Sequence, residues 1–295
     1  MSFILQQLIT GLSIGGIYAL IAVGYALIYS VFDFSNFAFG CVMMVSGFVF
    51  YFCLEVVEYS ILSAFMLSIL ASIVVSLLTE LLAYRPLRRK GTNRLFLMIT
   101  GMGIDLAVTN TATILLGANA RGIDLSPYSI DGTVNLGNVF VTKLDVFALI
   151  LAFIILAILY LFIYRTKPGL GIRASAYDVS IAGMMGINVN KVSIIIFLIS
   201  GITAGFAGIL CGLKYAVIPT LGSTPAQKAF IASVVGGLGS LPGAVLGGLI
   251  LGILETLTSG FISSVYRDLI SYAVLIVAML FLPHGLLGKK QGDKL

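Results

Sequence analysis

Long apolar segments follow one another along the chain, separated by short polar stretches. An α-helix needs about 20 mostly apolar residues to cross the hydrocarbon core of a bilayer, and most of these segments approach that length. A ninth segment, residues 227–235, is too short to cross alone. The pattern predicts an all-α polytopic membrane protein with about eight transmembrane helices plus one or two broken or re-entrant helices. The eight long segments cover roughly residues 4–30, 37–54, 61–83, 95–116, 145–164, 192–213, 244–258 and 265–282.

Polar and glycine-rich residues interrupt this pattern at two places. Residues 33–40 read DFSNFAFG, and residues 235–248 read VGGLGSLPGAVLGG. Inside a membrane, a non-helical segment occurs only where protein or a water-lined cavity provides hydrogen bonds for its backbone N–H and C=O groups. Both stretches are therefore candidates for broken helices along a transport path. Close packing through GxxxG-like spacings explains the glycines equally well. The candidate path residues are Asn36, Phe37, Gly40, Lys228, Phe230, Gly236, Gly237, Gly239 and Gly243.

Composition agrees with a membrane protein. Apolar residues make up 59% and charged residues 10% of the 295 residues, and the mean hydropathy is +1.12, outside the range of soluble domains. The formal net charge is +5, but twelve of the 17 basic residues gather in residues 85–94, 165–191 and 289–294. Short basic loops of this kind face the cytoplasm. The positive net charge therefore reflects the orientation of the loops in the membrane and does not indicate a nucleic-acid partner.

The basic stretches predict an orientation in the cell membrane. With residues 84–94 inside, counting the spans places the N-terminus outside, residues 117–144 outside and residues 165–191 inside. The outer stretch 117–144 carries turn signals and has room for short extended segments. To place the Lys-rich tail in the cytoplasm as well, residues 227–235 and the glycines after them must form a broken crossing or a re-entrant element. We expect one transmembrane domain over residues 1–295, in contact with membrane lipid.

Few residues offer chemistry. Asp105 is the carboxylate within a span that best suits a functional role, because an asparagine and three threonines within about two turns make its span unusually polar. Glu80 and Asp268 lie beside basic residues and are expected either to snorkel or to pair locally. The chain has one histidine, its three cysteines lack CxxC spacing, and no GxxxxGK[ST] motif is present. The sequence therefore indicates neither an enzyme nor a bound metal or other cofactor.

One loop differs from the others. Residues 169–192 read GLGIRASAYDVSIAGMMGINVNKV, a charge-bearing stretch of small residues with helical character. The order of its residues resembles the cytoplasmic coupling loop of ABC-importer permeases of the branched-chain amino acid (Liv) type. In this chain the corresponding loop covers about residues 165–191. An ordinary surface helix is the simpler alternative. The residues that carry the resemblance are Gly171, Arg173, Ala174, Ala176, Asp178, Ala182, Met185, Gly186 and Ile187.

The resemblance to this family extends over nearly the whole chain. Residues 36–40 match its Asn-Phe-Ala-x-Gly element, and residues 83–91, reading AYRPLRRKG, match its basic loop. Residues 228–230, reading KAF, together with residues 236–255 match its most distinctive block. Residues 282–288 resemble its Arg-Pro-x-Gly-Leu-x-Gly ending. Four or five matching blocks in the right order are a strong indication of this family.

The resemblance implies a heteromeric importer. Such a complex contains a second, homologous permease chain, two cytoplasmic ATPase subunits and an extracytoplasmic substrate-binding protein. A short helix within residues 173–187 would sit in a cleft of the ATPase. The small side chains of Ala174, Ala176 and Ala182 would allow close approach. Arg173 and Asp178 would fix the register through charge-assisted contacts.

Alternatives remain open at this point. Phe39 stands where family members usually have histidine, and Cys41 where they often have glutamate. The cargo therefore stays open between branched-chain or other hydrophobic amino acids and the urea, amides, sugars or nucleosides of related permeases. A stand-alone ion-coupled transporter would use Asp105 and Glu255 as coupling sites. A passive channel for a small solute is a third possibility.

Overall fold

The computed structural model describes residues 2–124, 132–136, 139–282 and 285–288. Its elements in chain order are α1 (Ser2–Phe32), α2 (Phe39–Tyr51), the π-helical turn η1 (Phe52–Val56), α3 (Ile61–Leu78), the π-helical turn η2 (Thr79–Tyr84), α4 (Arg85–Arg89), α5 (Arg94–Leu116), β1 (Thr133–Leu136), β2 (Val139–Thr142), α6 (Lys143–Arg165), α7 (Lys167–Tyr177), α8 (Val179–Met184), α9 (Val189–Tyr215), α10 (Ser223–Gly236), α11 (Leu241–Phe261), the 3-10 turn η4 (Ser264–Tyr266) and α12 (Arg267–Phe281).

Eight helical segments in the described part of the chain are long and apolar enough to cross a membrane. Their bounds agree with the predicted apolar segments, so the all-α fold with about eight spans is confirmed. The extra short helix is also present: α10 has 14 residues, which is about 21 Å of helix and less than a bilayer core. Extended segments predicted after α5 form the antiparallel hairpin of β1 and β2. The turn signals at Ser126, Pro127 and Asp131 lie outside the described residues.

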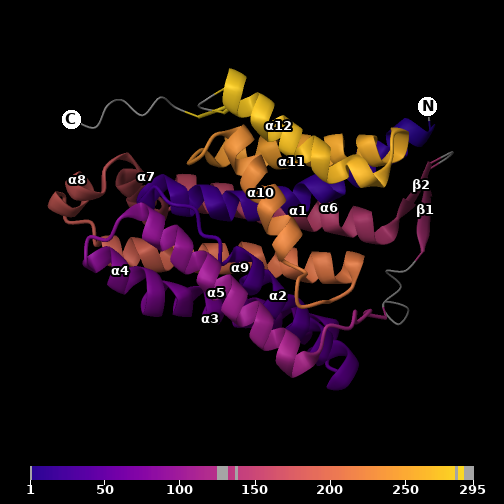
Figure 1. Cartoon of the computed structure of the whole chain (residues 1–295), viewed down its shortest axis with the longest axis horizontal. Helices are drawn as coiled ribbons and strands as arrows, with labels where there is room; N and C mark the ends of the chain where they lie inside the picture. Colours follow the sequence, from indigo (N-terminus) through magenta and orange to yellow (C-terminus); the bar gives the residue numbers. More distant parts are fainter. Residues whose placement is uncertain (1, 125–131, 137–138, 283–284, 289–295) are drawn as a thin grey trace.

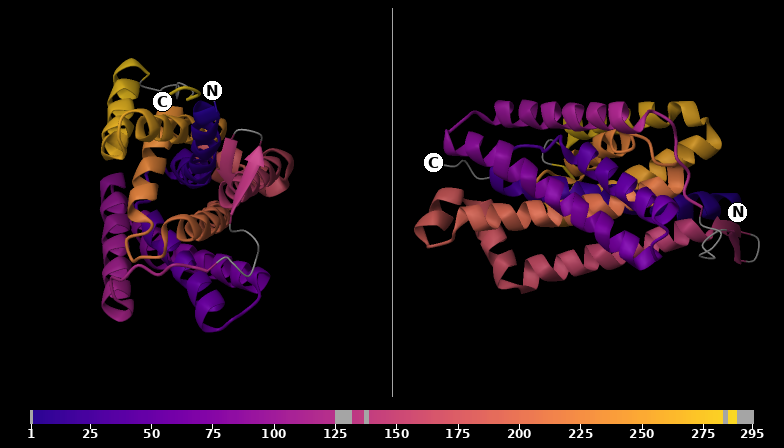
Figure 2. Two further views of the ribbon diagram at one scale, coloured as in Figure 1. Left: turned by 90° about the vertical axis from the view of Figure 1, so that its right-hand side faces the viewer. Right: turned by 90° about the horizontal axis from the view of Figure 1, so that it is seen from below.

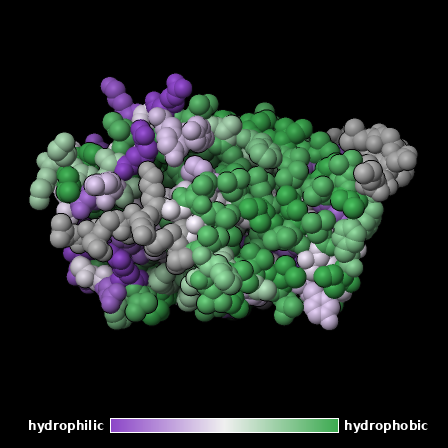
Figure 3. Space-filling view, turned by 90° about the horizontal axis from the view of Figure 1, so that it is seen from above, coloured by the Kyte–Doolittle hydropathy of each residue, from purple (hydrophilic) through white to green (hydrophobic). Residues whose placement is uncertain are grey.

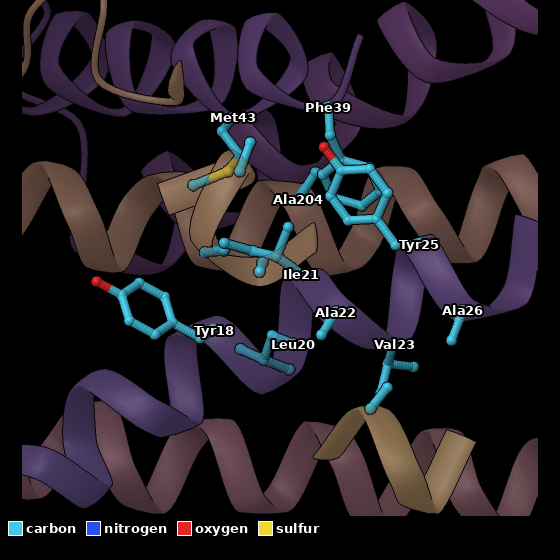
Figure 4. Packing of buried hydrophobic residues seen from close by; sticks show 14 of the residues in the cluster. Tyr18, Leu20, Ile21, Ala22, Val23, Tyr25, Ala26, Phe39, Met43 and Ala204 are labelled. Carbon is cyan, nitrogen blue, oxygen red and sulfur yellow. The ribbon is translucent and has the colours of Figure 1, made fainter. Parts of the chain in front are cut away.

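Helix α1 runs through the centre of the bundle and packs against α6, α9, α10 and α11 (Figures 1 and 2). Its side chains are buried on all sides over most of its length, which explains why it is hydrophobic all round. Ile21 and Tyr25 point toward Met43 and Phe39 of α2, while Val23 points to the opposite side (Figure 4). The core is thus organised around α1.

The surface of the molecule is divided along its long axis. A broad hydrophobic surface covers the middle, and hydrophilic residues gather toward one end (Figure 3). Basic helix α4 and the pair α7 and α8 lie at that end, whereas α1 begins beside the β-hairpin at the other (Figure 1). Exposed apolar side chains of this extent fit lipid contact better than contact with water. The described chain is a multi-pass membrane protein with two different polar ends.

Glycines bring α1 and α11 into direct backbone contact. A Cβ added at Gly15 would lie 2.8 Å from the Cα of Leu249, and one added at Gly252 would overlap the backbone of Gly15. Helices in a membrane associate through close packing of small residues, because lipid tails remove the hydrophobic driving force between them. The glycine spacing of α11, which is compatible with both a broken helix and close packing, serves packing here.

Serines hold α3 and α2 against α9. The hydroxyl groups of Ser72 and Ser76 on α3 donate to the carbonyls of Gly201 and Phe197, at 2.9 and 2.7 Å. Ser46 on α2 donates to the carbonyl of Gly205 at 2.9 Å. Small residues at these crossings let the helices approach, and each hydroxyl has a partner in a medium without water. These contacts give the bundle a second rigid group beside α1 and α11.

The glycine-rich stretch 235–248 forms a turn with close backbone packing, which is one of the two arrangements that its composition allows. Gly237 and Gly239 have φ angles of 111° and 85° and form the turn between α10 and α11, beside the last turn of α1. Gly236 and Gly243 pack backbone against backbone across this turn. Tight turning and close approach therefore account for all four glycines. The interruption at membrane depth precedes α10.

We expect Gly252→Ala to lower the thermal unfolding midpoint of the detergent-purified protein, since overpacking of a tight contact costs roughly 1–3 kcal/mol. Gly103→Ala is the matched control, because it adds the same methyl group to a helix where nothing lies within 4 Å. Equal midpoints for the two variants would show that the α1–α11 contact is not as close as described.

Candidate functional site

Two helices begin near the middle of the bundle and meet there. α2 starts after the predicted polar interruption, and α10 starts after the loop 216–222. A Cβ added at Gly222 would overlap the carbonyl of Gly40, and one added at Gly40 would lie 2.8 Å from a carboxylate oxygen of Asp105. Asp105 is the twelfth of the 23 residues of α5. The junction, as we call the contact of Gly40 with Gly222, therefore lies at about half the depth of α5.

Polar side chains satisfy the backbone at the junction. Asp105 Oδ1 accepts a hydrogen bond from the backbone N–H of Cys41 at 2.6 Å. Asn36 Oδ1 accepts from the N–H of Ala38 at 3.0 Å and from the hydroxyl of Tyr84 at 2.6 Å. The first N–H groups of a helix have no partner within it, so these side chains cap α2 inside the bundle. The predicted path residues Asn36 and Asp105 are thus both brought to the start of α2.

Aromatic rings surround the junction. Phe37 and Phe230 lie 5.4 Å apart between ring centroids, Phe230 and Tyr25 lie 5.9 Å apart, and Tyr25 stacks on Phe39 at 5.0 Å. The rings come from α1, from α10, and from the start of α2 and the residues just before it. They bring Phe37 and Phe230, which the sequence predicts for the path, into contact. Outside the capping groups, the junction is apolar.

The polar face of α5 is satisfied by its own helix. The side chains of Asn110, Thr111 and Thr113 donate to the carbonyls one turn earlier, at 2.7 to 2.9 Å. Such local bonds satisfy a polar side chain without a neighbouring helix. Asn110 and Thr111 are nevertheless exposed in the outer half of the helix, nearer the β-hairpin. The described chain therefore leaves polar groups uncovered on a span-length helix.

A cavity of about 470 Å³ lies between α2 and α5, on the hairpin side of the junction. Its size falls within the range of small-molecule sites. Apart from one threonine, its lining side chains are aliphatic, aromatic or thioether groups. They are Met44, Val45, Phe48, Val49 and Phe52 from the α2 side and Ala107, Val108, Thr111, Ala112, Leu115 and Leu116 from α5.

Lys228 belongs to a buried ion pair outside the junction. Its Nζ contacts the fully buried Glu255 of α11 and lies 2.8 Å from a carboxylate oxygen of Asp268 on α12. Glu255 also accepts hydrogen bonds from the hydroxyls of Tyr18 at 2.7 Å and Ser271 at 3.2 Å. Charges inside a membrane are tolerated when paired. This cluster fixes α10 to α1, α11 and α12.

The predicted local pairing of Glu80 is confirmed, and that of Asp268 takes a different form. Glu80 pairs with Arg88 of the basic helix α4. Asp268 pairs with Lys228, which is forty residues earlier in the sequence, and sequence reasoning missed this contact because the two groups approach only in the folded bundle.

The loop with the small residues forms two short helices, α7 and α8, at the basic end. Asp178 Oδ1 accepts hydrogen bonds from the N–H groups of Ser180 and Ile181 at 2.7 and 2.9 Å, so it caps α8. The guanidinium of Arg173 lies 5.3 Å from the centroid of the Tyr164 ring. Both charged residues thus have local partners. Their predicted contacts with another protein remain a prediction.

Small residues of this loop mostly shape the chain itself. Ala182 is buried, and Ala174 and Ala176 are half-buried. Gly186 ends α8 with a φ of 83°, and Gly171 packs near Val192 at the start of α9. The buried position of Ala182 turns its side chain toward the bundle. The small size of Ala182 predicts close approach to a partner protein, but its methyl group is buried within this chain and cannot contact one in this structure.

Large apolar residues point outward from the same loop. Tyr177, Met184 and Met185 are exposed by 84%, 86% and 79%, and Ile181 is exposed by 53%. Of these, only Met185 was a predicted site residue. Ile181 and Met184 could have been found from their helical spacing with Met185 once the cap of α8 at Asp178 is known, whereas Tyr177 is the last residue of α7. Because the sequence predicts that this loop docks on another protein, we call these four side chains the docking surface.

The described residues contain no group of three or more His, Cys, Asp or Glu that would hold a metal ion. The three cysteines are buried free thiols. The site consists of the junction, the cavity beside it and the docking surface at the basic end.

A family model described as the branched-chain amino acid transport system permease component matches residues 7–279. The chain is 34% identical to the high-affinity branched-chain amino acid transport system permease protein BraD of Pseudomonas aeruginosa, covering 98% of this chain and 97% of that protein. It is 34% identical to the permease protein LivH of Escherichia coli, covering 99% and 98%. A ribose import permease protein, RbsC of E. coli, is 31% identical over 44% of this chain and 43% of its own length.

We expect Lys228→Met to destabilise the protein strongly, because removing one partner of a buried pair leaves an uncompensated charge and costs on the order of 3–5 kcal/mol. The double variant Lys228→Met/Glu255→Gln removes that charge while keeping a hydrogen-bond acceptor for Tyr18. It should therefore unfold at a higher temperature than the single variant in a thermal assay in detergent. A double variant no more stable than Lys228→Met would contradict the ion pair.

Proposed function

The chain belongs to the family of branched-chain amino acid transport permease components, and from this membership we propose that it is the transmembrane permease subunit of an ATP-driven (ABC) importer. With a second, homologous permease it forms the path for branched-chain or other hydrophobic amino acids. Two cytoplasmic ATPase subunits supply the energy, and an extracytoplasmic binding protein delivers the cargo. The observation that carries the proposal is the similarity over nearly the full length of the chain to BraD and LivH.

The docking surface supports an ATPase partner. Exposed side chains of Tyr177, Ile181, Met184 and Met185 form an apolar surface on a helical segment at the basic end. Apolar surface beyond the membrane belt is costly in water and is typical of a protein interface. In this proposal the docking surface enters a cleft of the ATPase. The shape of the loop that carries it is set by Gly171, Arg173, Ala174, Ala176, Asp178, Ala182 and Gly186.

Exposed polar groups at membrane depth support a second permease. α5 and α12 lie along one side of the molecule with α10 between them (Figure 2). Asn110 is exposed on α5, which is long enough to span the membrane, and Gln227 is exposed on the short helix α10 inside the bundle. Polar side chains inside a membrane face a protein or a water-filled cavity. We therefore assign this side to the second permease, with the path between the two chains.

Charge supports the orientation. The basic helix α4 and the pair α7 and α8 lie at one end of the bundle, and α1 begins at the other. Placing the basic end in the cytoplasm follows the positive-inside rule. The N-terminus then lies outside, where the β-hairpin end receives the binding protein, and the C-terminus is cytoplasmic.

An apolar cargo fits the junction. The rings of Phe37, Phe39 and Phe230 and the apolar cavity beside them offer dispersion contacts to an aliphatic side chain and few hydrogen bonds to a sugar or urea. Ion coupling through Asp105 or Glu255 is less suited to the structure, since one carboxylate caps α2 and the other is held in an ion pair.

We expect Met184→Asp to abolish co-purification of the ATPase with the tagged chain in mild detergent, because it places a charge in the centre of the docking surface. Asn190→Asp introduces the same side chain at an exposed position nearby and should retain the ATPase. Retention of the ATPase by Met184→Asp would exclude this docking surface.

The orientation predicts which added cysteines react with a membrane-impermeant maleimide on intact cells. Tyr59→Cys, in the exposed connection between η1 and α3, should be labelled from outside. Thr92→Cys, between α4 and α5, should be labelled only after permeabilisation. The unmodified chain, whose cysteines are all buried, gives the background. The reverse pattern would overturn the orientation.

A further inference from the structure

Two buried sets of polar contacts, one at Glu80 and one at Tyr84, lie between the start of α9 and the junction, and the π-helical turn η2 joins them. We propose that these contacts and η2, together called the relay, transmit the movement of the docking loop, formed by α7 and α8, to the start of α2. Ser193, Glu80, Tyr84 and Asn36 are its positioning residues. The inference rests on the proposed ATP-driven import and names the part of the permease through which that energy reaches the path.

The first step of the relay is at the basic end. Ser193 lies in the second turn of α9, and its hydroxyl donates to Glu80 Oε1 at 2.6 Å. Arg88 NH2 pairs with the same carboxylate and donates to the Ser193 hydroxyl at 2.7 Å. Glu80 and Ser193 have no exposed surface. Any displacement of the start of α9 therefore acts on a buried charge that has few other ways to be satisfied.

The Glu80 site is only partly satisfied. Within the described residues, Glu80 Oε2 and Arg88 NH1 are buried without a hydrogen-bond partner. An unpaired polar atom of a buried ion pair costs free energy, so this arrangement is poised to change when the surrounding helices move.

The second step runs through the π-helical turn η2. Glu80 and Tyr84 lie in this single six-residue turn. π-helical turns are rare, appear mostly as single turns within α-helices and are frequent at functional sites. Since both side chains belong to one irregular turn, a shift of Glu80 rotates the backbone that carries Tyr84.

The third step reaches the junction. The hydroxyl of the fully buried Tyr84 donates to Asn36 Oδ1, the atom that also accepts from the N–H of Ala38 at the start of α2. Two residues later, Gly40 contacts Gly222, so moving the α2 start moves the α10 start as well. α5 crosses closely at this point: a Cβ at Gly101 would lie 2.5 Å from the Tyr84 hydroxyl. Packed contacts this tight shift between discrete arrangements and cannot absorb small displacements.

Tyr84 and Ser193 couple ATP hydrolysis to transport in this proposal. If their role were only structural, their loss would lower ATP hydrolysis and uptake together. Tyr84→Phe removes the hydroxyl and keeps the ring that packs on Phe34 and Phe197. Ser193→Ala interrupts the other end of the relay. Ser76→Ala is the matched control, since it also removes a buried hydroxyl between α3 and α9, one turn before Glu80 and outside the relay.

The test uses the complete importer, with both permeases, both ATPases and the binding protein, in proteoliposomes. Binding-protein-stimulated ATP hydrolysis and leucine uptake are measured together, and their ratio is the readout. We expect Tyr84→Phe and Ser193→Ala to keep stimulated hydrolysis within about twofold of the parent while uptake falls about tenfold, the effect of one lost buried hydrogen bond. Ser76→Ala should leave the ratio unchanged.

The double variant Tyr84→Phe/Ser193→Ala separates a route from two independent contacts. Because both residues act in series, it should be no worse coupled than either single variant. Normal coupling in both single variants, an equal loss in Ser76→Ala, or additive losses in the double variant would each overturn the relay. Absence of ATP-driven uptake of any branched-chain or other hydrophobic amino acid by the parent complex would instead refute the proposed function, so the two failures are distinguishable.

Discussion

Backbone that leaves the helix inside a membrane has to find every hydrogen bond within the protein, and this requirement governs the structure. α2 and α10 both begin at mid-depth, where Asp105 and Asn36 supply acceptors for the free N–H groups of α2. Glycines allow the two starts to touch, and aromatic rings close the space around them. The rest of the bundle, from the α1–α11 contact to the serines of α3, holds these starts in place.

The same requirement explains where the chain can move. Regular helices locked by glycine and serine contacts form rigid groups, whereas the irregular parts around the junction are the interruption before α2, the loop before α10 and the π-helical turn η2. These irregular parts touch one another through Asn36, Tyr84 and Gly40. A permease that reorients around a fixed path has to concentrate its movement in such segments, and this chain places them between the docking loop and the junction.

Sequence patterns predicted the spans well because apolar length alone decides whether a helix crosses a membrane. They also predicted the short helix α10, from loop charge and the parity of crossings. The glycine-rich turn was interpreted as a candidate break at membrane depth because composition cannot distinguish close packing from an interruption. Nor can it show that Gly222 meets Gly40, since such contacts arise between residues far apart in the chain. The outward face of α8 was missed because its helical phase depends on the cap at Asp178.

We propose that this chain works as one of two permeases coupled to two ATPases. Native mass spectrometry of the tagged chain, purified in mild detergent from its own membrane, would show the composition of the complex. We expect a particle containing one copy of this chain, one copy of a second permease and two ATPase subunits. A particle containing this chain alone, under conditions in which another ABC importer stays intact, would contradict this proposal.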